Sequence, residues 1–237
     1  MICSEVIEKL QSYSSEKYKA NVVKMGIPEK CSIGVPTSDI RKLAKEIGKS
    51  NELAFDLWET GYHEAKLLAV LLFEKNKISH ADIEKLMSGV FSWDLCDHLC
   101  KNLIIKIKNY DEFIVKWSNS TEIYKMRAAF TLIASAAIHD NKITEDTIDK
   151  YLELIKECSS VQQEHVKKAV SWALREIGKI DYKNNEKALI LANELKENGN
   201  KTQIWIAKDV LKEIENVVKV AGRKRLISKN TKMGQAD

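Results

Sequence analysis

The chain has 237 residues, which is enough to bury a sizeable core as one domain or one continuous helical array. Hydrophobic residues make up 44% and charged residues 30%, a composition typical of a folded, water-soluble protein and not of a disordered one. The net charge is only +4, so a nucleic-acid site would require cations gathered on one face, not overall basicity.

The elements expected along the chain are helices, because apolar residues recur at intervals of three and four, not two. Two helices are expected first, over residues 2–12 and 14–24. The stretch MGIPEKCSIGVP contains both prolines of the chain and predicts the one substantial loop. Another pair of helices follows, over residues 38–47 and 52–58.

Long helices are expected to alternate with shorter ones over the rest of the chain. The long helices are predicted to begin near Tyr62, Ser92, Thr121, Val161 and Thr202. The shorter helices are predicted over Ser79–Met87, Asp111–Trp117, Thr144–Glu157 and Asn184–Glu197. The long helices recur roughly every 30 to 40 residues, as in two-helix repeats of the HEAT or armadillo type. The sequence therefore predicts an all-α superhelical solenoid of antiparallel helix pairs, with one helix of each pair on an inner face.

Residues 1–220 are expected to form a single domain, followed by a basic, flexible tail over residues 221–237. The tail contains one carboxylate, Asp237, and the cations Arg223, Lys224, Arg225, Lys229 and Lys232. It therefore accounts for the net charge of +4, and the rest of the chain is electrically balanced. A solvated, frayed end and a DNA-contacting arm are the two interpretations of this tail.

The five cysteines are odd in number and widely spaced, which indicates reduced thiols in a cytoplasmic protein. Cys96 and Cys100 lie one helical turn apart, but His98 points to another face and no fourth ligand is near. Core cysteines are therefore predicted, without a metal. No apolar run is long enough to span a bilayer, and Glu5 and Glu8 interrupt the region where a signal peptide would be apolar.

Aromatic and charged residues recur together on the predicted long helices. Trp93 and Asp97 lie four residues apart and so project from one helix face. A core tryptophan beside an aspartate that caps or pairs with a neighbour is the alternative. Tyr124 precedes Arg127 by three residues on the same face of its helix. Arg127 could equally serve as an interhelical ion-pair partner.

The helix near residue 170 repeats this combination. Trp172 is followed three residues later by Arg175, and Lys167 and Lys168 stand at the head of the helix. A core tryptophan with a solvated arginine is again the alternative, and Trp205 is assigned to the core. On a shared concave face these residues would form a stripe of cations and aromatics, which suits phosphates and bases or sugars.

A carboxylate among such cations repels phosphate, so Asp97 requires a separate role, such as stabilising a developing positive charge. The sequence has no glycine-rich phosphate loop, no HExxH, no G-x-S-x-G and no paired cysteine motif. Nucleotide-dependent and metal-dependent chemistry are therefore unsupported, and no cofactor is expected.

Four segments, GVPTSDIRKLAKEI, WDLCDHLC, WSNSTEIYKMRAAF and KKAVSWALREIGK, together resemble the DNA alkylation repair (AlkD-like) glycosylases. The resemblance extends from about residue 10 to about residue 215, and the W-D-x-x-D and A-x-x-W-x-L-R-E patterns are its most specific parts. It implies a stack of HEAT-like repeats that holds duplex DNA in a concave basic groove. Members of this family excise positively charged N3- and N7-alkylated purines.

The resemblance also implies roles for individual residues. Asp97 corresponds to the catalytic aspartate, Trp93 and Trp172 to the two tryptophans of the site, and Arg127 to its arginine. Arg175 corresponds to a DNA-contacting arginine. The chain departs from the family where it has Tyr124, Lys125 and Met126, since the family often has tryptophan and a double arginine there. We expect Tyr124, Lys125, Lys167, Lys168 and Arg175 to bind DNA.

The implied chemistry needs few groups. A purine alkylated at N3 or N7 is already cationic, so it leaves without a general acid, and one carboxylate can stabilise the oxocarbenium-like sugar and position a water. Tryptophan faces would favour the same cationic sugar. The resemblance further implies that the lesion stays in the base stack, unlike the flipped base of most glycosylases.

Three hypotheses follow from the sequence. The first is a base-excision-repair enzyme that hydrolyses the N-glycosidic bond of alkylated purines in duplex DNA and acts as a monomer. The second is a non-catalytic HEAT-like binder of damaged or branched DNA. The third is a protein-interaction scaffold. Asp97 favours the first over the second, because a carboxylate near phosphate offers a pure binder nothing, and the cations of the long helices disfavour the third.

Overall fold

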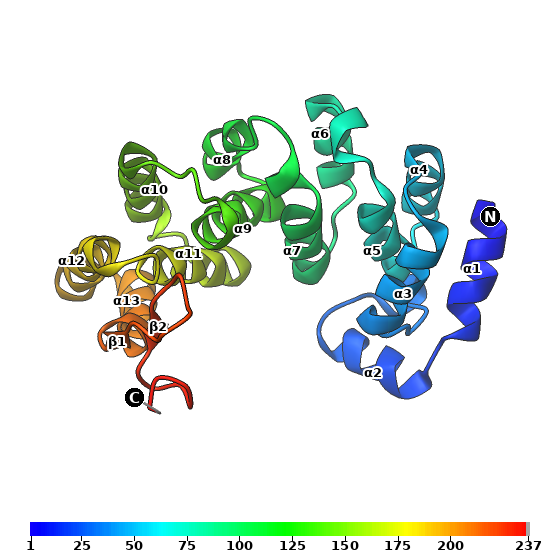
Figure 1. Cartoon of the computed structure of the whole chain (residues 1–237). Coiled ribbons are helices and arrows are strands. Elements are labelled where there is room, and N and C mark those ends of the chain that lie inside the picture. The colour runs from blue at the N-terminus through cyan, green and yellow to red at the C-terminus, as the bar shows by residue number, and fades with distance from the viewer. Residues whose placement is uncertain (236–237) are drawn as a thin grey trace. The chain divides into compact units, whose positions relative to one another are not determined.

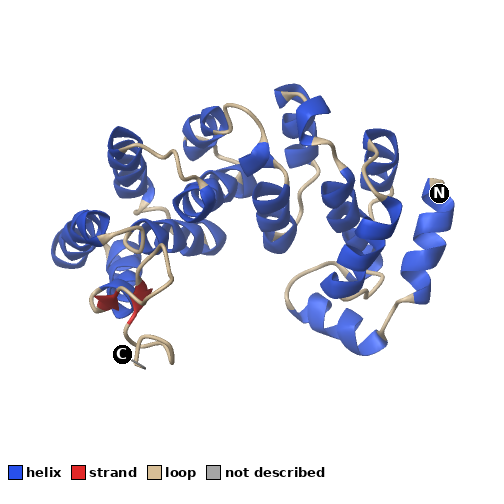
Figure 2. Ribbon diagram, in the orientation of Figure 1, coloured by secondary structure: helices blue, strands red, loops and turns tan. Residues whose placement is uncertain are grey.

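The computed structural model describes residues 1–235, which belong to two compact units, Met1–Tyr110 and Asp111–Asp237 (Figure 1). Ala236 and Asp237, at the end of the predicted tail, lie outside the described residues. The described part contains thirteen α-helices, three short 3₁₀ helices and one two-stranded sheet (Figure 2). The all-α class predicted from the sequence is confirmed. Within residues 1–235, no helix is both long and apolar enough to cross a membrane.

The first unit is centred on helix α5, nine of whose ten residues are buried. Helices α3, α4 and α7 all pack against α5. The α-helices of this unit are α1 (Cys3–Ser12), α2 (Glu16–Lys24), α3 (Thr37–Ile47), α4 (Asn51–Glu59), α5 (His63–Leu72), α6 (His80–Ser88) and α7 (Trp93–Asn102). The 3₁₀ helices are η1 (Glu29–Cys31), η2 (Lys75–Lys77) and η3 (Ile104–Lys106).

The second unit repeats one packing scheme three times. Helices α9, α11 and α13 pack in succession, and α8, α10 and α12 pack against them in the same order (Figure 1). The bounds are α8 (Asp111–Ser118), α9 (Ile123–His139), α10 (Glu145–Cys158), α11 (Glu164–Ile177), α12 (Tyr182–Asn198) and α13 (Lys201–Ile214). The expected alternation in length is wrong here, because α12 has 17 residues, as many as α9, and α10 and α11 have 14 each. Successive helices of this unit alternate instead between two layers, one with α8, α10 and α12 and the other with α9, α11 and α13.

Several helices begin at side chains that satisfy free backbone N–H groups. Ser50 and Thr144 accept hydrogen bonds from the backbone at the starts of α4 and α10, as is usual for N-cap residues. Asn200 caps α13 and Glu122 precedes α9, so these helices begin within two residues of the predicted Thr202 and Thr121. Helix α11 begins three residues after the predicted Val161. At α7 the Ser92 hydroxyl makes no backbone cap and turns to a carboxylate instead.

The segment after α13 folds back onto the second unit. Strands β1 (Val217–Val218) and β2 (Ile227–Ser228) pair antiparallel, with Val217 opposite Ser228. The backbone N–H of Leu226 donates to the carbonyl oxygen of Lys179 at 2.9 Å, and the Leu226 side chain is buried. Part of the segment that the sequence sets apart as a tail is therefore packed, while its division from a domain of residues 1–220 stays a prediction.

Candidate functional site

Trp93 and Asp97 lie on α7 in the first unit. Trp93 is the first residue of the helix and half-buried, and its indole Nε1 donates to the carbonyl oxygen of Met25 at 3.4 Å. Asp97 follows one turn later on the same face, with only 9% of its surface exposed. A carboxylate this buried is weakly screened, so it acts strongly on any charge that forms beside it.

The start of α7 is held by a hydrogen-bonded group that sequence reasoning missed. Asp94 Oδ1 accepts from the Ser92 hydroxyl at 2.7 Å, and Asp94 Oδ2 lies 2.8 Å from His63 Nε2. Burial alone would raise the pKa of Asp94, but the hydrogen bond and charge of His63 lower it below its ordinary value. His63 begins α5 and is 1% exposed, so this pair fixes α7 against α5 next to Trp93.

The remaining polar residues of α7 belong to the core. Cys96 and Cys100 are fully buried free thiols, and His98 Nε2 lies 3.0 Å from the carbonyl oxygen of Leu67. Burial and the positive charge of Arg41 lower the pKa of His98 to about 4, so its ring is neutral at pH 7. Over residues 1–235, no three His, Cys, Asp or Glu side chains gather as a metal site would require.

The loop between α2 and α3 is fixed by a second buried carboxylate, Glu64 of α5. Its oxygens accept from the backbone N–H groups of Ile33 at 2.9 Å, Gly34 at 2.7 Å and Val35 at 3.3 Å. Gly34 has a φ of +93°, and a Cβ there would lie 2.7 Å from Cβ of Lys19. Only glycine fits this approach. The contact holds the loop against α2, at whose end lies the carbonyl group that Trp93 contacts.

Tyr124, Lys125 and Arg127 lie in the first turns of α9 in the second unit. Arg127 is 6% exposed, and its Nη1 donates to the carbonyl oxygen of His165 at 2.7 Å. The ring of Tyr124 lies 5.9 Å from that of His165, and Lys125 forms an ion pair with Glu122 at 2.6 Å. Arg127 thus joins α9 to the start of α11 through a backbone carbonyl group.

Lys167 and Lys168 share Glu164 in the first turn of α11, at 2.5 Å and 3.1 Å. Lys167 Nζ also lies 4.2 Å from the centre of the Trp205 ring, a cation–π contact. Trp205 is 37% exposed, so its assignment to the core is wrong. The ammonium group of Lys167 lies over its face.

Trp172 of α11 is oriented by Glu176, one turn further along. The indole Nε1 donates to Glu176 Oε1 at 3.2 Å, and Lys179 Nζ donates to the same oxygen at 2.9 Å. Arg225, beyond α13, reaches Glu176 Oε2 through Nη1 at 2.8 Å and the Glu176 carbonyl oxygen through Nη2 at 2.6 Å. Burial alone would raise the pKa of Glu176, but Lys179 and Arg225 lower it below its ordinary value.

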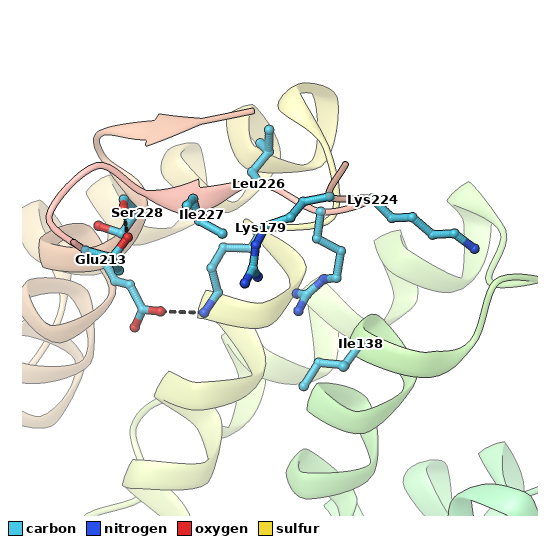
Figure 3. A pocket seen from close by; sticks show the side chains of 10 residues that line it. Ile138, Lys179, Glu213, Lys224, Leu226, Ile227 and Ser228 are labelled. Atoms are coloured by element: carbon cyan, nitrogen blue, oxygen red, sulfur yellow. Dashed lines mark hydrogen bonds and ion pairs between the residues drawn. The ribbon is translucent and has the colours of Figure 1, made fainter. Parts of the chain in front are cut away.

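Figure 3 shows how the C-terminal segment meets this end of α11. Lys179 points to Glu213 of α13, with which it forms an ion pair, while Leu226 and Ile227 lie above them. A cavity of about 450 Å³ opens there, lined also by Ile138 and by the cations Arg223, Lys224 and Arg225. The segment beyond residue 220 is thereby joined to the carboxylate that orients Trp172.

Arg175, expected to contact DNA, is held by carboxylates of α13. Its Nη1 lies 3.0 Å from Glu213 Oε2 and 3.7 Å from Asp209 Oδ2, and Asp209 also accepts from the Ser171 hydroxyl at 2.6 Å. These contacts offset the charge of Arg175 and fix its side chain near Trp172.

The structure brings the expected residues together in two groups. Trp93 and Asp97 lie on one helix of the first unit. Arg127 and Trp172 lie in the second unit, on the adjacent helices α9 and α11. That the four residues form one site stays a prediction.

The layered helix pairs define an all-α protein with the fold of HEAT-like repeats. A solved structure with a TM-score of 0.75 and 23% sequence identity covers 99% of this chain and 93% of its own. It is described as "a new family of proteins related to the HEAT-like repeat DNA glycosylases with affinity for branched DNA structures". The family model of the DNA alkylation repair enzymes matches residues 6–214, so the chain belongs to that family. No curated protein matches it.

Proposed function

We propose that the protein is a DNA glycosylase that removes positively charged N3- and N7-alkylated purines from duplex DNA. The observation that carries the proposal is the placement of Asp97 on α7, nearly buried and one turn from the half-buried indole of Trp93. Membership of the DNA alkylation repair family supports the same conclusion. The reaction would place the enzyme at the first step of base excision repair.

The proposed reaction replaces the bond between sugar C1′ and purine N9 with a bond between C1′ and a water oxygen, and one proton passes from that water to Asp97. The bond between sugar C1′ and purine N9 breaks, and its electron pair leaves with the base, whose positive charge is thereby neutralised. The positive charge moves to the sugar, where Asp97 stabilises it. Water oxygen then bonds to C1′, and Asp97 is placed to accept the proton that this water loses. No acid is needed for the leaving group.

Trp93 has a separate task in this proposal. An indole face attracts a cation through the ring quadrupole, and the attraction grows when water is excluded. Trp93 is fixed through Met25, and the helix that carries it is fixed by Asp94 and His63. A rigid aromatic face beside Asp97 would therefore favour the cationic sugar without having to reorganise as the charge develops.

The second unit would supply the grip on DNA. Trp172 would pack on the sugar of the lesion, and Arg127 would contact the backbone. Tyr124, Lys125, Lys167, Lys168 and Arg175 would contact the neighbouring phosphates. The support for this assignment is that Lys167, Lys168 and Trp172 lie on α11 and that Arg127 joins α11 to α9. Cations on one structural layer neutralise successive phosphates and release counterions.

We further propose that the protein works as a monomer in the cytoplasm and needs neither metal nor cofactor. Its five cysteines are all free thiols, which suits a reducing compartment. Residues 1–220 would act as one DNA-binding domain, with the remaining residues as a basic extension that braces the end of α11.

The direct test is release of 7-methylguanine or 3-methyladenine from methylated duplex DNA with enzyme in excess. Release well above the spontaneous rate is expected. If a protein that binds the same duplex releases the base only at the spontaneous rate, the proposed glycosylase activity is excluded.

A second candidate is a non-catalytic binder of damaged or branched DNA. It is favoured by the structural neighbour with the description quoted above, although 23% identity carries only the fold. The two candidates differ in Asp97, because a binder gains nothing from a carboxylate near phosphate. A binder would prefer a four-way junction to a linear duplex, and Asp97→Asn would leave or improve that affinity.

A further inference from the structure

Five cations of the first unit form a group that we call the basic cluster: Arg41, Lys45, Lys49, Lys75 and Lys106. They come from α3, from the turn after it, and from the 3₁₀ helices η2 and η3. All five side chains are exposed. Among the residues that the structure describes, none of the five forms an ion pair with a carboxylate.

The members of the basic cluster act on one another. Arg41, Lys45 and Lys49 line a single cavity of about 480 Å³ together with Ala44, Gly48 and Leu71. Burial, and then the positive charges of Lys49, Lys75 and Arg41, lower the pKa of Lys106. Like charges repel one another, so gathering these cations lowers the stability of the folded protein. A role other than stability would therefore explain why they lie together.

The carboxylates next to the basic cluster are already engaged. Glu46 pairs with Lys9, Asp39 with Lys42 at 2.8 Å, and Glu74 with Lys77 at 3.0 Å. Over the part of the chain that the structure describes, this surface therefore combines ordinary ion pairs with five cations that have no carboxylate partner.

A purely structural role accounts for one member. Lys49 Nζ donates to the carbonyl oxygens of Leu71 at 2.8 Å and Phe73 at 3.0 Å, which stabilises the end of α5. Arg41 makes one long hydrogen bond, from Nη2 to Asn102 Oδ1 at 3.5 Å. Within residues 1–235, no side-chain hydrogen bond accounts for the positions of Lys45, Lys75 and Lys106.

We propose that the basic cluster binds phosphates of the DNA backbone. The choice of DNA as the ligand rests on the proposed function, whereas the site itself is argued from the cations that have no carboxylate partner. Arg41, Lys45 and Lys49 line one cavity, while Lys75 and Lys106 come from separate segments. Cations spread in this way match a chain of phosphates better than a single small anion.

The contact between the basic cluster and the end of α7 fits this ligand. Arg41 contacts Asn102, the last residue of α7, whereas Trp93 is the first. Nine steps of about 1.5 Å place the two ends of the helix roughly 14 Å apart. Phosphates recur about every 3.4 Å along the axis of one strand, so for a duplex whose axis follows α7 the cluster would meet phosphates about four nucleotides from a lesion at Trp93.

The test compares two double variants of the full chain. Lys45→Gln with Lys75→Gln removes two cluster charges, while Lys77→Gln with Lys85→Gln removes two exposed lysines paired with Glu74 and Glu59. Binding of an unmodified duplex is measured by fluorescence anisotropy over a series of salt concentrations. The slope of log K against log salt should fall by nearly two in the cluster variant and hardly at all in the control. If the cluster variant and the parent bind equally at 1 M salt, a slope change of about 1.8 corresponds to a loss of affinity of roughly 60-fold at 0.1 M salt.

Equal slopes in the two double variants would overturn the proposal. Lys45→Arg with Lys75→Arg should restore the slope, since it keeps the charge, and failure to do so would also count against phosphate binding. Inorganic phosphate is titrated in parallel by NMR. If the cluster variant loses phosphate shifts but keeps the DNA slope, the site takes a small anion and the DNA assignment is wrong. Because the duplex carries no lesion, a protein without excision activity could still confirm the cluster.

Discussion

Replacing Arg225 tests whether the C-terminal segment braces the helix that carries Trp172. Arg225 makes two charge-assisted contacts with Glu176, at 2.8 Å to the carboxylate and 2.6 Å to the carbonyl oxygen. A hydrogen bond to a charged group contributes about 1.5–3 kcal/mol when protected from water. The Arg225 side chain is 26% exposed and Lys179 still pairs with Glu176 in its absence, so we expect Arg225→Ala to cost about 2 kcal/mol.

The matched control is Lys224→Ala, which removes the same charge from the adjacent exposed residue. Urea unfolding at pH 7, followed by tryptophan fluorescence, gives both free energies of unfolding. The pH dependence adds a second check. The pKa of folded Glu176 is lowered, so its stabilising contribution is present above the ordinary glutamate pKa and is lost as pH falls through the folded value. Arg225→Ala should weaken this loss in acid. Equal free energies for Arg225→Ala and Lys224→Ala at pH 7 would refute the bracing role.

Three other predictions concern the two units separately. His98→Gln should make the protein less sensitive to acid. The folded pKa of His98 is about 4 against an ordinary 6.5, so the parent loses about 3 kcal/mol of stability as pH falls through that interval. If the free energy of unfolding falls equally in parent and variant between pH 7 and pH 4.5, the prediction is wrong. Glu64→Gln should lower the free energy of unfolding by roughly 3 kcal/mol, because its carboxylate accepts from three backbone N–H groups, whereas the exposed Glu52→Gln should change it little; urea midpoints compare the two. Arg127→Ala should weaken duplex binding and reduce the salt slope by about one, and an unchanged slope would place Arg127 away from phosphate.

The fold could be predicted from the sequence because helical periodicity and helix-ending residues are local signals. The predicted helices over residues 38–47 and 52–58 correspond to α3 and α4 within a residue at each end. Length was misjudged at a weak start signal: the predicted helix over Asn184–Glu197 is three residues shorter than α12, which already begins at Tyr182 after the N-cap Asp181.

The contacts that hold the candidate residues could not be predicted in the same way. His63 and Asp94 are 31 residues apart, and Glu176 and Arg225 are 49 apart. Periodicity places each of these residues on a helix or in a tail but cannot identify its partner. Trp205 shows the same limit, since an apolar position four residues after the start of a helix resembles core, whereas the structure leaves it exposed with Lys167 over its ring. Trp93 and Asp97 could be paired from their spacing alone, because one helix carries both.

The most direct measurement is single-turnover release of 7-methylguanine from methylated duplex DNA by the parent protein and by Asp97→Asn. The matched control is Asp56→Asn, which changes an exposed carboxylate of the same unit. We predict that Asp97→Asn lowers the rate by roughly 100- to 1,000-fold, as expected when one preorganised electrostatic group is removed, while duplex affinity is kept. Release by Asp97→Asn at the parental rate would contradict the proposed role of Asp97.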